Sequence, residues 1–297
     1  MTRSNRRTVA LVQHACGNDP ETNLERSVAG VREAADNGAT LVLLQELHRT
    51  PYPCQSEDPA GFDQAEPVPG PTSERLGRLA AECGVVIVGS VFERRAPGLA
   101  HNTAVILDSD GRLAGRYRKM HIPDDPGYYE KFYFTPGDTG FEPVDTTAGR
   151  LGVLVCWDQW FPEAARLMAL AGAEMLLYPT AIGWTSEDDA AEQQRQHTAW
   201  TVIQQSHAVA NGLPVLVCNR WGHEPDPSGA GAGITFWGSS FVAGPQGEIL
   251  ARAGTDTDAV TLAQLDTERN DTVRRMWPFL RDRRIDAYDA LTRRYRD

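Results

Sequence analysis

The sequence predicts a single α/β domain in which sheets are covered by helices. Two patterns support this prediction: short apolar runs alternate with segments of helical spacing, and several pairs of runs are joined by tight turns, as in β-hairpins. No internal repeat, low-complexity block or linker divides the 297 residues. We therefore expect one core over about residues 8–276, followed by a tail over residues 277–297.

The first part of the chain predicts a strand, a helix and a second strand. Residues 8–13 form a short β-branched run, and residues 21–37 carry apolar side chains at helical spacing before an Asn-Gly stop. Residues 40–45 are apolar on both faces, which is typical of a buried strand. Residues 49–71 are rich in Pro, Gly and acidic residues and predict a long surface loop, and loops of that length are often functional.

The rest of the chain continues this alternation. Strands are predicted where short apolar runs end at turn residues, and the long helix at 190–211 ends at Gly212, a typical C-cap residue. In order, we expect a helix at 72–83, a strand at 85–92, a hairpin from 102–107 and 113–117, a loop over 124–140, a hairpin from 141–144 and 151–155, a helix at 161–172, a strand at 175–178, a helix at 190–211, a strand at 215–218, a hairpin from 240–243 and 248–251, a strand at 258–265 and a helix at 267–276.

Composition argues against several classes of function. The formal net charge of −11 argues against a nucleic-acid partner and mildly favours cationic small molecules. No stretch approaches the ~18 apolar residues of a membrane span, and the basic N-terminus lacks the features of a signal peptide. The cysteines and histidines show no metal-ligand spacing, so no metal site is expected. The scattered, odd set of cysteines suggests reduced thiols and a cytoplasmic setting.

Cys156 lies at a predicted junction between a strand and a helix, a position that suits a catalytic cysteine. The apolar run Gly152–Val155 ends at Cys156, and Phe161-Pro162-Glu163 then opens a helix, since Pro and Glu both suit a first helical turn. Backbone N–H groups at such a junction can lower the pKa of a thiol and stabilise an oxyanion. The alternative is a buried structural cysteine, which is the commoner role of a lone Cys.

Two more ionisable residues, Glu46 and Lys119, also follow apolar strands. Because α/β folds place their sites at strand ends, both side chains can meet Cys156. A carboxylate would then accept the thiol proton, while Lys119 and the backbone N–H of Trp157 would stabilise a tetrahedral intermediate. Taken singly, Glu46 could equally be an exposed carboxylate at a strand end and Lys119 a solvated cation in a loop. Spacing alone does not establish that the two side chains meet Cys156.

Three segments around these residues resemble the catalytic motifs of the nitrilase (carbon–nitrogen hydrolase) superfamily. They are Leu43-Leu44-Gln45-Glu46-Leu47, Tyr117-Arg118-Lys119-Met120-His121-Ile122-Pro123 and Gly152-Val153-Leu154-Val155-Cys156-Trp157-Asp158. The resemblance runs from about Thr8 to the C-terminus and includes family-like loops at 126–134, 136–141 and 178–183. It implies a four-layer α-β-β-α sandwich and a Glu–Lys–Cys triad that needs neither a metal nor an organic cofactor.

The resemblance also implies roles for single residues. Glu46 would be the general base, Cys156 the nucleophile, and Lys119 with the Trp157 N–H the oxyanion stabilisers. Glu130 matches a second glutamate of many members and would position Lys119 and the substrate. The alternative for Glu130 is a surface charge beside Lys131.

Within the superfamily the resemblance is closest to amidases of N-carbamoyl amines, which implies a ureido substrate with a cationic end. An ammonium group needs anionic or π-rich surroundings. The candidates are Glu187, Asp188 and Asp189, with Tyr52 and Trp184 as walls. The alternative is that the three acids form a solvated run that caps the following helix.

Two other functions remain open from the sequence. The same chemistry would suit another N-carbamoyl amine, an N-carbamoyl amino acid or an aliphatic amide. A catalytically silent binding or scaffold subunit is the third possibility, against which the intact Glu46, Lys119 and Cys156 argue. Members of the superfamily usually assemble as dimers or larger homo-oligomers, and the apolar residues after Trp277 would suit such a contact.

Overall fold

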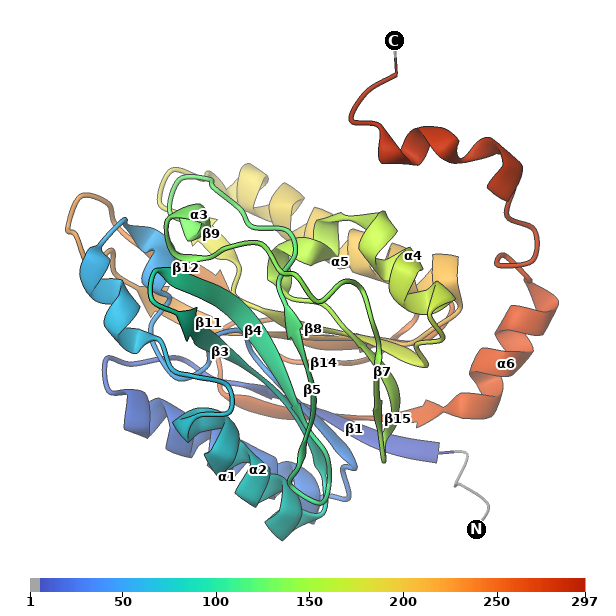
Figure 1. The fold of residues 1–297 in the computed structure, drawn as a ribbon, viewed down its shortest axis with the longest axis horizontal. Coiled ribbons are helices and arrows are strands. Elements are labelled where there is room, and N and C mark those ends of the chain that lie inside the picture. Colours follow the sequence, from blue (N-terminus) through green and yellow to red (C-terminus); the bar gives the residue numbers. More distant parts are fainter. Residues whose placement is uncertain (1–5, 297) are drawn as a thin grey trace.

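A computed structural model describes residues 6–296, in which two six-stranded sheets pack face to face (Figure 1). The first sheet contains, in spatial order, β15 (Ala259–Asp266), β1 (Arg6–Gln13), β2 (Leu41–Leu44), β3 (Val86–Ala96), β4 (Leu99–Leu107) and β5 (Leu113–Arg118). The second contains β14 (Ile249–Arg252), β13 (Phe241–Ala243), β10 (Val215–Asn219), β8 (Met175–Thr180), β7 (Gly149–Val153) and β6 (Val144–Thr146).

Helices cover the outer face of each sheet and complete four layers (Figure 1). The first sheet is covered by α1 (Pro20–Asp36) and α2 (Pro71–Cys83), and the second by α4 (Pro162–Leu170) and α5 (Ala190–Asn211). This is the α-β-β-α sandwich that the sequence implied, and the prediction of fold class is confirmed.

Alternation along the strands explains why the layers form. Leu11 and Leu43 point between the sheets and share one buried cluster with Val217 of the opposite sheet. Their neighbours Val12 and Leu44 point the other way, into a second cluster with α1 and α2. Successive side chains of a strand face opposite sides, so a strand apolar at every position can serve both clusters. Burying each such side chain contributes about 1.5–3 kcal/mol.

The structure differs from the prediction in three places. A small third sheet, β11–β12–β9, was not predicted: β9 (Gly183–Thr185), β11 (Trp221–Glu224) and β12 (Ile234–Trp237) are only three or four residues long. The second predicted hairpin is shifted, since its strands are β6 and β7. The two predicted loops contain short helical turns, at Pro53–Gln55, Pro59–Gln64 and α3 (Glu130–Tyr133).

The body of the fold ends with α6 (Thr267–Met276), and the chain beyond it extends away from the layers (Figure 1). This tail carries large apolar side chains in the open: Trp277 is 51% exposed, Ile285 72%, Leu291 63% and Tyr295 83%. None of the helices in the described part of the chain is long and apolar enough to cross a membrane.

Candidate active site

Cys156 lies in a strained turn just after β7. Its φ is +43°, a left-handed conformation that costs a residue with a side chain roughly 1–2 kcal/mol. Asp158 holds the turn in place, since Oδ2 accepts hydrogen bonds from the Val155 N–H (2.9 Å) and the Tyr117 hydroxyl (2.9 Å). A non-glycine residue keeps such a conformation only where its surroundings enforce it, and this happens mostly at functional sites.

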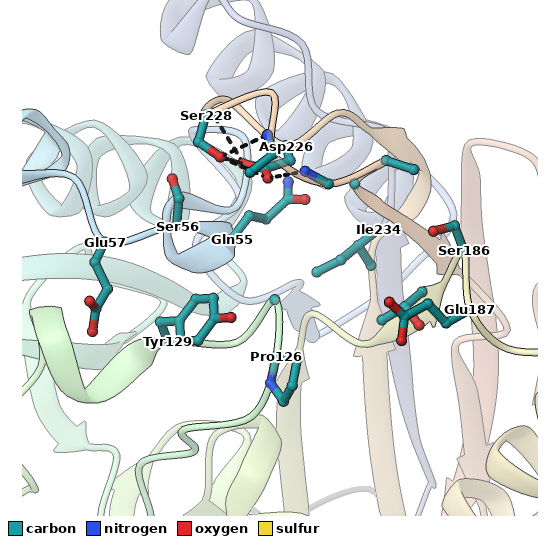
Figure 2. A pocket seen from close by; sticks show the side chains of 16 residues that line it. Gln55, Ser56, Glu57, Pro126, Tyr129, Ser186, Glu187, Asp226, Ser228 and Ile234 are labelled. Carbon is teal, nitrogen blue, oxygen red and sulfur yellow. Dashed lines mark hydrogen bonds between the residues drawn. The ribbon is translucent and has the colours of Figure 1, made fainter.

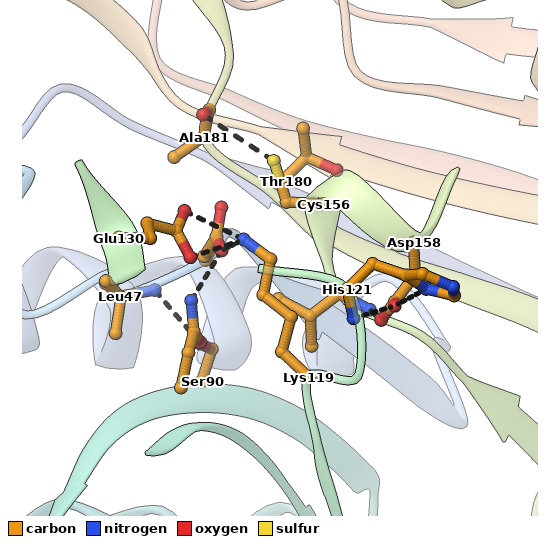
Figure 3. Close-up of polar contacts among 12 residues, drawn as sticks. Leu47, Ser90, Lys119, His121, Glu130, Cys156, Asp158, Thr180 and Ala181 are labelled. Atoms are coloured by element: carbon orange, nitrogen blue, oxygen red, sulfur yellow. Dashed lines mark hydrogen bonds and ion pairs between the residues drawn. The ribbon is translucent and has the colours of Figure 1, made fainter. Parts of the chain in front are cut away.

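Lys119 lies between two glutamates that come from different elements. Its Nζ contacts Glu46 Oε1 at 2.9 Å and both carboxylate oxygens of Glu130 at 2.8 Å, as Figure 3 shows for Lys119 and Glu130. All three side chains are at most 1% exposed. Burial alone would lower the pKa of Lys119, but Glu130 and then Glu46 outweigh it and raise the pKa well above its usual value. Lys119 is therefore held as a cation.

Glu46 keeps one oxygen available. Oε1 accepts hydrogen bonds from Lys119 and from Asn102 Nδ2, the latter at 2.7 Å. Oε2 is buried and has no hydrogen-bond partner among the described residues. Proton transfer to a base requires an oxygen that no protein donor already occupies, and Oε2 meets this condition. Glu46 is thus fixed in place with one oxygen available to accept a proton.

The Cys156 thiol is buried beside these groups, with Sγ 3.7 Å from the Ala181 carbonyl oxygen (Figure 3). Burial raises the pKa of the thiol well above its usual value; Glu46 raises it further and Lys119 opposes the rise. The sequence-based prediction of a lowered thiol pKa is therefore wrong, because α4 begins only at Pro162 and burial dominates. A neutral thiol needs a base, and Glu46 is the neighbouring group suited to that task.

A cavity of about 580 Å³, hereafter the active-site cavity, opens onto Cys156 and Trp157. Its walls are acidic and aromatic. The carboxylates are Asp125, Glu130, Glu187, Asp188 and Glu192, and the aromatic residues besides Trp157 are Tyr128, Trp160 and Trp237. Arg195 also lines the cavity, and its guanidinium is paired with Glu192 at 2.6 Å.

A second hollow of about 530 Å³ adjoins this cavity and shares Pro126, Thr185 and Glu187 with it (Figure 2). It adds the carboxylates of Glu57 and Asp226 to the acidic surface. The Asp226 carboxylate is already engaged by its own loop, because it accepts hydrogen bonds from several N–H and O–H groups there. The acidic character of the active-site cavity thus extends outward.

The structure separates the residues predicted for the substrate site. Glu187 and Asp188 line the active-site cavity, and Asp188 is oriented by hydrogen bonds from Thr185 and Gln196. Asp189 does not line it: its carboxylate accepts a hydrogen bond from the Glu192 N–H at 2.8 Å and caps α5. For Asp189 the capping alternative is therefore the correct one.

Tyr52 and Trp184 were predicted as walls, and both lie behind the wall instead. Tyr52 is 1% exposed, and its hydroxyl donates a hydrogen bond to Glu130 at 2.7 Å. Trp184 donates through Nε1 to the Gln193 carbonyl and packs against Trp237, which is the residue that reaches the cavity. Their aromatic character alone could not distinguish an exposed wall from the layer that supports it.

Other contributors were missed. Asn102 on β4 holds Glu46, and Trp237 comes from the third sheet, which was not predicted. Tyr128 and Asp125 lie in the loop after Lys119, where the signals were an aromatic and acidic composition and, for Tyr128, the family-like segment 126–134. Among the described residues, no group of three or more His, Cys, Asp or Glu side chains is arranged to hold a metal ion.

Comparison with known proteins agrees with this geometry. The carbon–nitrogen hydrolase family profile matches residues 8–275. N-carbamoylputrescine amidase of Solanum lycopersicum is 48% identical over 96% of this chain and 94% of its own length, and citrullinase of Francisella tularensis is 40% identical over 97% and 98%. A crystal structure of a carbon–nitrogen hydrolase from Helicobacter pylori G27 superposes with a TM-score of 0.95 at 52% identity, covering 98% of this chain and all of that one. The chain therefore belongs to the carbon–nitrogen hydrolase family and is a hydrolase that acts on amides.

Proposed function

We propose that this hydrolase cleaves N-carbamoylputrescine to putrescine, ammonia and carbon dioxide, a step of putrescine synthesis from agmatine. The observation that carries the proposal is the acidic active-site cavity over a buried thiol: among the described residues, five carboxylates line it beside the guanidinium of Arg195. A substrate with a ureido group at one end and an ammonium at the other fits this arrangement. The 48% identity to a tomato N-carbamoylputrescine amidase supports it.

The proposed reaction begins with the transfer of the Cys156 proton to Glu46. The thiolate attacks the ureido carbonyl carbon, and Lys119 with the Trp157 N–H stabilises the resulting oxyanion. Collapse of this intermediate expels ammonia or the amine, protonated by Glu46, and leaves a thioester on Cys156. A ureido carbonyl is a poor electrophile because two nitrogens donate electrons to it, so both a desolvated thiolate and a strong oxyanion site are needed.

Water then completes the cycle. Glu46, now unprotonated, activates a water molecule that attacks the thioester and releases Cys156. The released carbamic acid decays to carbon dioxide and an amine or ammonia. Glu130 would act throughout by holding Lys119, whose Nζ it contacts through both oxygens at 2.8 Å.

The ammonium end of the substrate would bind among Asp125, Glu187 and Asp188. These three carboxylates line the same cavity as Cys156. Asp188 is held in one orientation by Thr185 and Gln196, which makes it a fixed acceptor and not a mobile surface charge. Tyr128 and Trp237 would supply aromatic surface to the same end of the ligand.

A second candidate substrate is a ureido amino acid such as citrulline. Two observations favour it: Arg195 lines the cavity and could meet a carboxylate, and a citrullinase is 40% identical to this chain. The acidic walls weaken it, because the carboxylates of Asp125, Glu187 and Asp188 would repel that of the substrate.

The proposal is tested by measuring ammonia release from N-carbamoylputrescine, citrulline and butylurea. Butylurea has the same four-carbon chain as N-carbamoylputrescine but lacks its terminal ammonium group. A charged hydrogen bond contributes about 1.5–3 kcal/mol, so kcat/KM should be about tenfold to a hundredfold higher for N-carbamoylputrescine than for butylurea. A preference for citrulline would overturn the proposed substrate, and turnover of none of the three would show that the enzyme acts on another amide.

We also propose that the tail over residues 277–297 forms a contact between copies of this chain. Six of its large apolar side chains, from Trp277 to Tyr295, are 38% to 83% exposed in the single chain. An apolar surface of that kind is usually covered in a stable assembly.

A further inference from the structure

We infer that Arg220 and Glu224 form a positioning pair that sets the places of both glutamates, Glu46 and Glu130. One arm of the pair runs from Arg220 to the backbone around Glu46, and the other runs from Glu224 through Tyr52 to Glu130. The inference rests on the roles proposed above for the two glutamates.

The pair is buried behind the active site, where β10 leads into β11. Arg220 Nη1 and Glu224 Oε1 are 2.7 Å apart, and the side chains are 0% and 4% exposed. Two charges removed from water are expensive, and apolar residues of similar volume often give an equally stable fold. Stability alone is therefore a weak reason for the pair, and its further contacts indicate what it does.

The first arm holds the turn that carries Glu46. Arg220 Nη2 donates hydrogen bonds to the carbonyl oxygens of Glu46 (2.8 Å) and Leu47 (3.0 Å), and Nη1 donates to that of Thr50 (3.1 Å). Leu47 has a φ of +46°, a left-handed conformation that needs outside support. Its N–H donates to Ser90 Oγ at 3.1 Å (Figure 3). The direction in which the Glu46 side chain leaves β2 thus depends on Arg220.

The second arm reaches Glu130. Glu224 Oε2 accepts a hydrogen bond from the Tyr52 N–H at 2.6 Å, while the Tyr52 hydroxyl donates to Glu130 Oε1 at 2.7 Å. Glu130 in turn contacts Lys119. The carboxylate of Glu224 therefore uses one oxygen for Arg220 and the other for the segment that fixes Glu130.

Both arms are hydrogen bonds from one buried ion pair to the same stretch of chain, residues 46–52. A shift of the pair would move Glu46 and Glu130 together and so change their distances to Lys119 and Cys156. Displacements of about 1 Å in an active site can cost about a hundredfold in rate. If the pair only stabilised the fold, its removal would lower the free energy of unfolding and leave the turnover of the folded enzyme unchanged.

The test is the double substitution Arg220→Met/Glu224→Met, which removes both charges at similar volume, beside the isosteric Glu224→Gln, which keeps only one of the two acceptors. For each variant we would measure kcat, KM, the pH profile of kcat/KM and urea unfolding. We expect kcat to fall about a hundredfold in the double variant, with KM changed less than about threefold and the acidic limb of the pH profile shifted. Glu224→Gln should show a smaller fall of the same kind.

Asp108→Asn is the matched control. Asp108 is a buried carboxylate (2% exposed) paired with Arg112 on the β4–β5 hairpin, and it does not line the active-site cavity. Its substitution should lower the free energy of unfolding and leave kcat and the pH profile as in the wild type.

Two results would overturn the inference. The first is a wild-type kcat and pH profile in both pair variants. The second is a fall in kcat no larger than that of Asp108→Asn for the same loss of unfolding free energy. If the double variant does not fold, Glu224→Gln decides between these outcomes. Cys156→Ala is assayed beside them. Activity in Cys156→Ala would overturn the proposed mechanism itself, whereas an inactive Cys156→Ala with fully active pair variants would overturn only the role of the pair.

Discussion

At the scale of single residues, the chemistry depends on charges packed where water is excluded. Lys119 is 0% exposed and is shared by two carboxylates, and the neutral thiol of Cys156 lies beside this group. In such surroundings the attraction between opposite charges is strong, but so is the cost of leaving one unpaired. The same cation therefore serves the fold in the resting state and, in our proposal, the oxyanion during the reaction.

The substitution Lys119→Met tests both roles of this cation, the one in stability and the one in catalysis. The substitution leaves the buried carboxylates of Glu46 and Glu130 without their cation, and losing one partner of a buried pair costs about 3–5 kcal/mol. We expect that loss in urea unfolding, together with loss of detectable ammonia release. The triple change Lys119→Met/Glu46→Gln/Glu130→Gln should recover most of the stability and none of the activity. Unchanged unfolding of Lys119→Met would contradict the buried ion-pair description.

At the scale of elements, the start of α5 shows how neighbouring acids acquire different tasks. Asp188 faces the active-site cavity, whereas Asp189 caps the helix. The one-residue difference decides the direction of the side chain, because Asp188 is drawn toward Thr185 and Gln196 and Asp189 toward the Glu192 N–H.

Asp188→Asn and Asp189→Asn form a matched pair of substitutions that tests this assignment. Asp188→Asn should raise KM for N-carbamoylputrescine about tenfold and leave KM for butylurea unchanged, because only the first substrate carries a charge. Asp189→Asn should leave both KM values unchanged, and Asp189→Ala should cost about 1 kcal/mol of stability through loss of the cap. Equal effects of the two Asn variants on KM would show that neither acid is specific for the ammonium.

The sequence predicts the long elements better than the short ones. The strands β1 and β2 follow from local apolar runs, and the end of α5 follows from Gly212, so the structure confirms all three elements within two residues. The third sheet depends on long-range pairing of strands only three or four residues long, which leaves no periodic signal.

A similar division holds for the site. Glu46, Lys119 and Cys156 stand in recognisable motifs, and the structure brings them together with Glu130. Their environment could not be predicted: the raised pKa of the Cys156 thiol comes from burial and from Glu46, and Asn102 is brought to Glu46 only by the pairing of β3 with β4. Likewise, the place of Tyr52 behind Glu130 follows from loop packing that a short aromatic motif does not encode.

At the scale of the whole molecule, we expect two buried histidines to make the free energy of unfolding depend on pH. His14 Nε2 and His48 Nδ1 both contact Ser27 Oγ, at 2.8 and 2.9 Å. Burial lowers the pKa of His14 to about 4 and that of His48 to about 3, against an ordinary value of 6.5. Below pH 6.5 the unfolded chain therefore binds protons that the folded one does not, and stability is lost as the pH falls.

His48→Asn tests this dependence, since the amide can keep the contact of Nδ1 with Ser27 but cannot titrate. The loss of unfolding free energy between pH 7 and pH 5 should be smaller in the variant by about 2 kcal/mol. Urea unfolding at both pH values, with wild-type protein measured in parallel, gives this difference. Equal pH dependence in the two proteins would mean that His48 is not buried in its neutral form.

The tail allows a test of assembly. Removal of residues 277–297 should lower the molar mass measured by light scattering, because the exposed apolar side chains of the tail would no longer join copies of the chain. The matched variant of full length carries Trp277→Ser, Ile285→Ser and Leu291→Ser, and its molar mass should fall in the same way. An assembly unchanged by either alteration would contradict the proposed contact.

The claim on which the account depends most is that Cys156 is the nucleophile. Its most direct measurement is kcat for ammonia release from N-carbamoylputrescine by Cys156→Ala, beside Cys218→Ala, which removes another fully buried thiol from the adjacent part of the sheet. The account predicts a loss of more than about a thousandfold in Cys156→Ala, since no other group can form the covalent intermediate, and near wild-type turnover in Cys218→Ala. Turnover of Cys156→Ala within tenfold of the wild type would contradict the account.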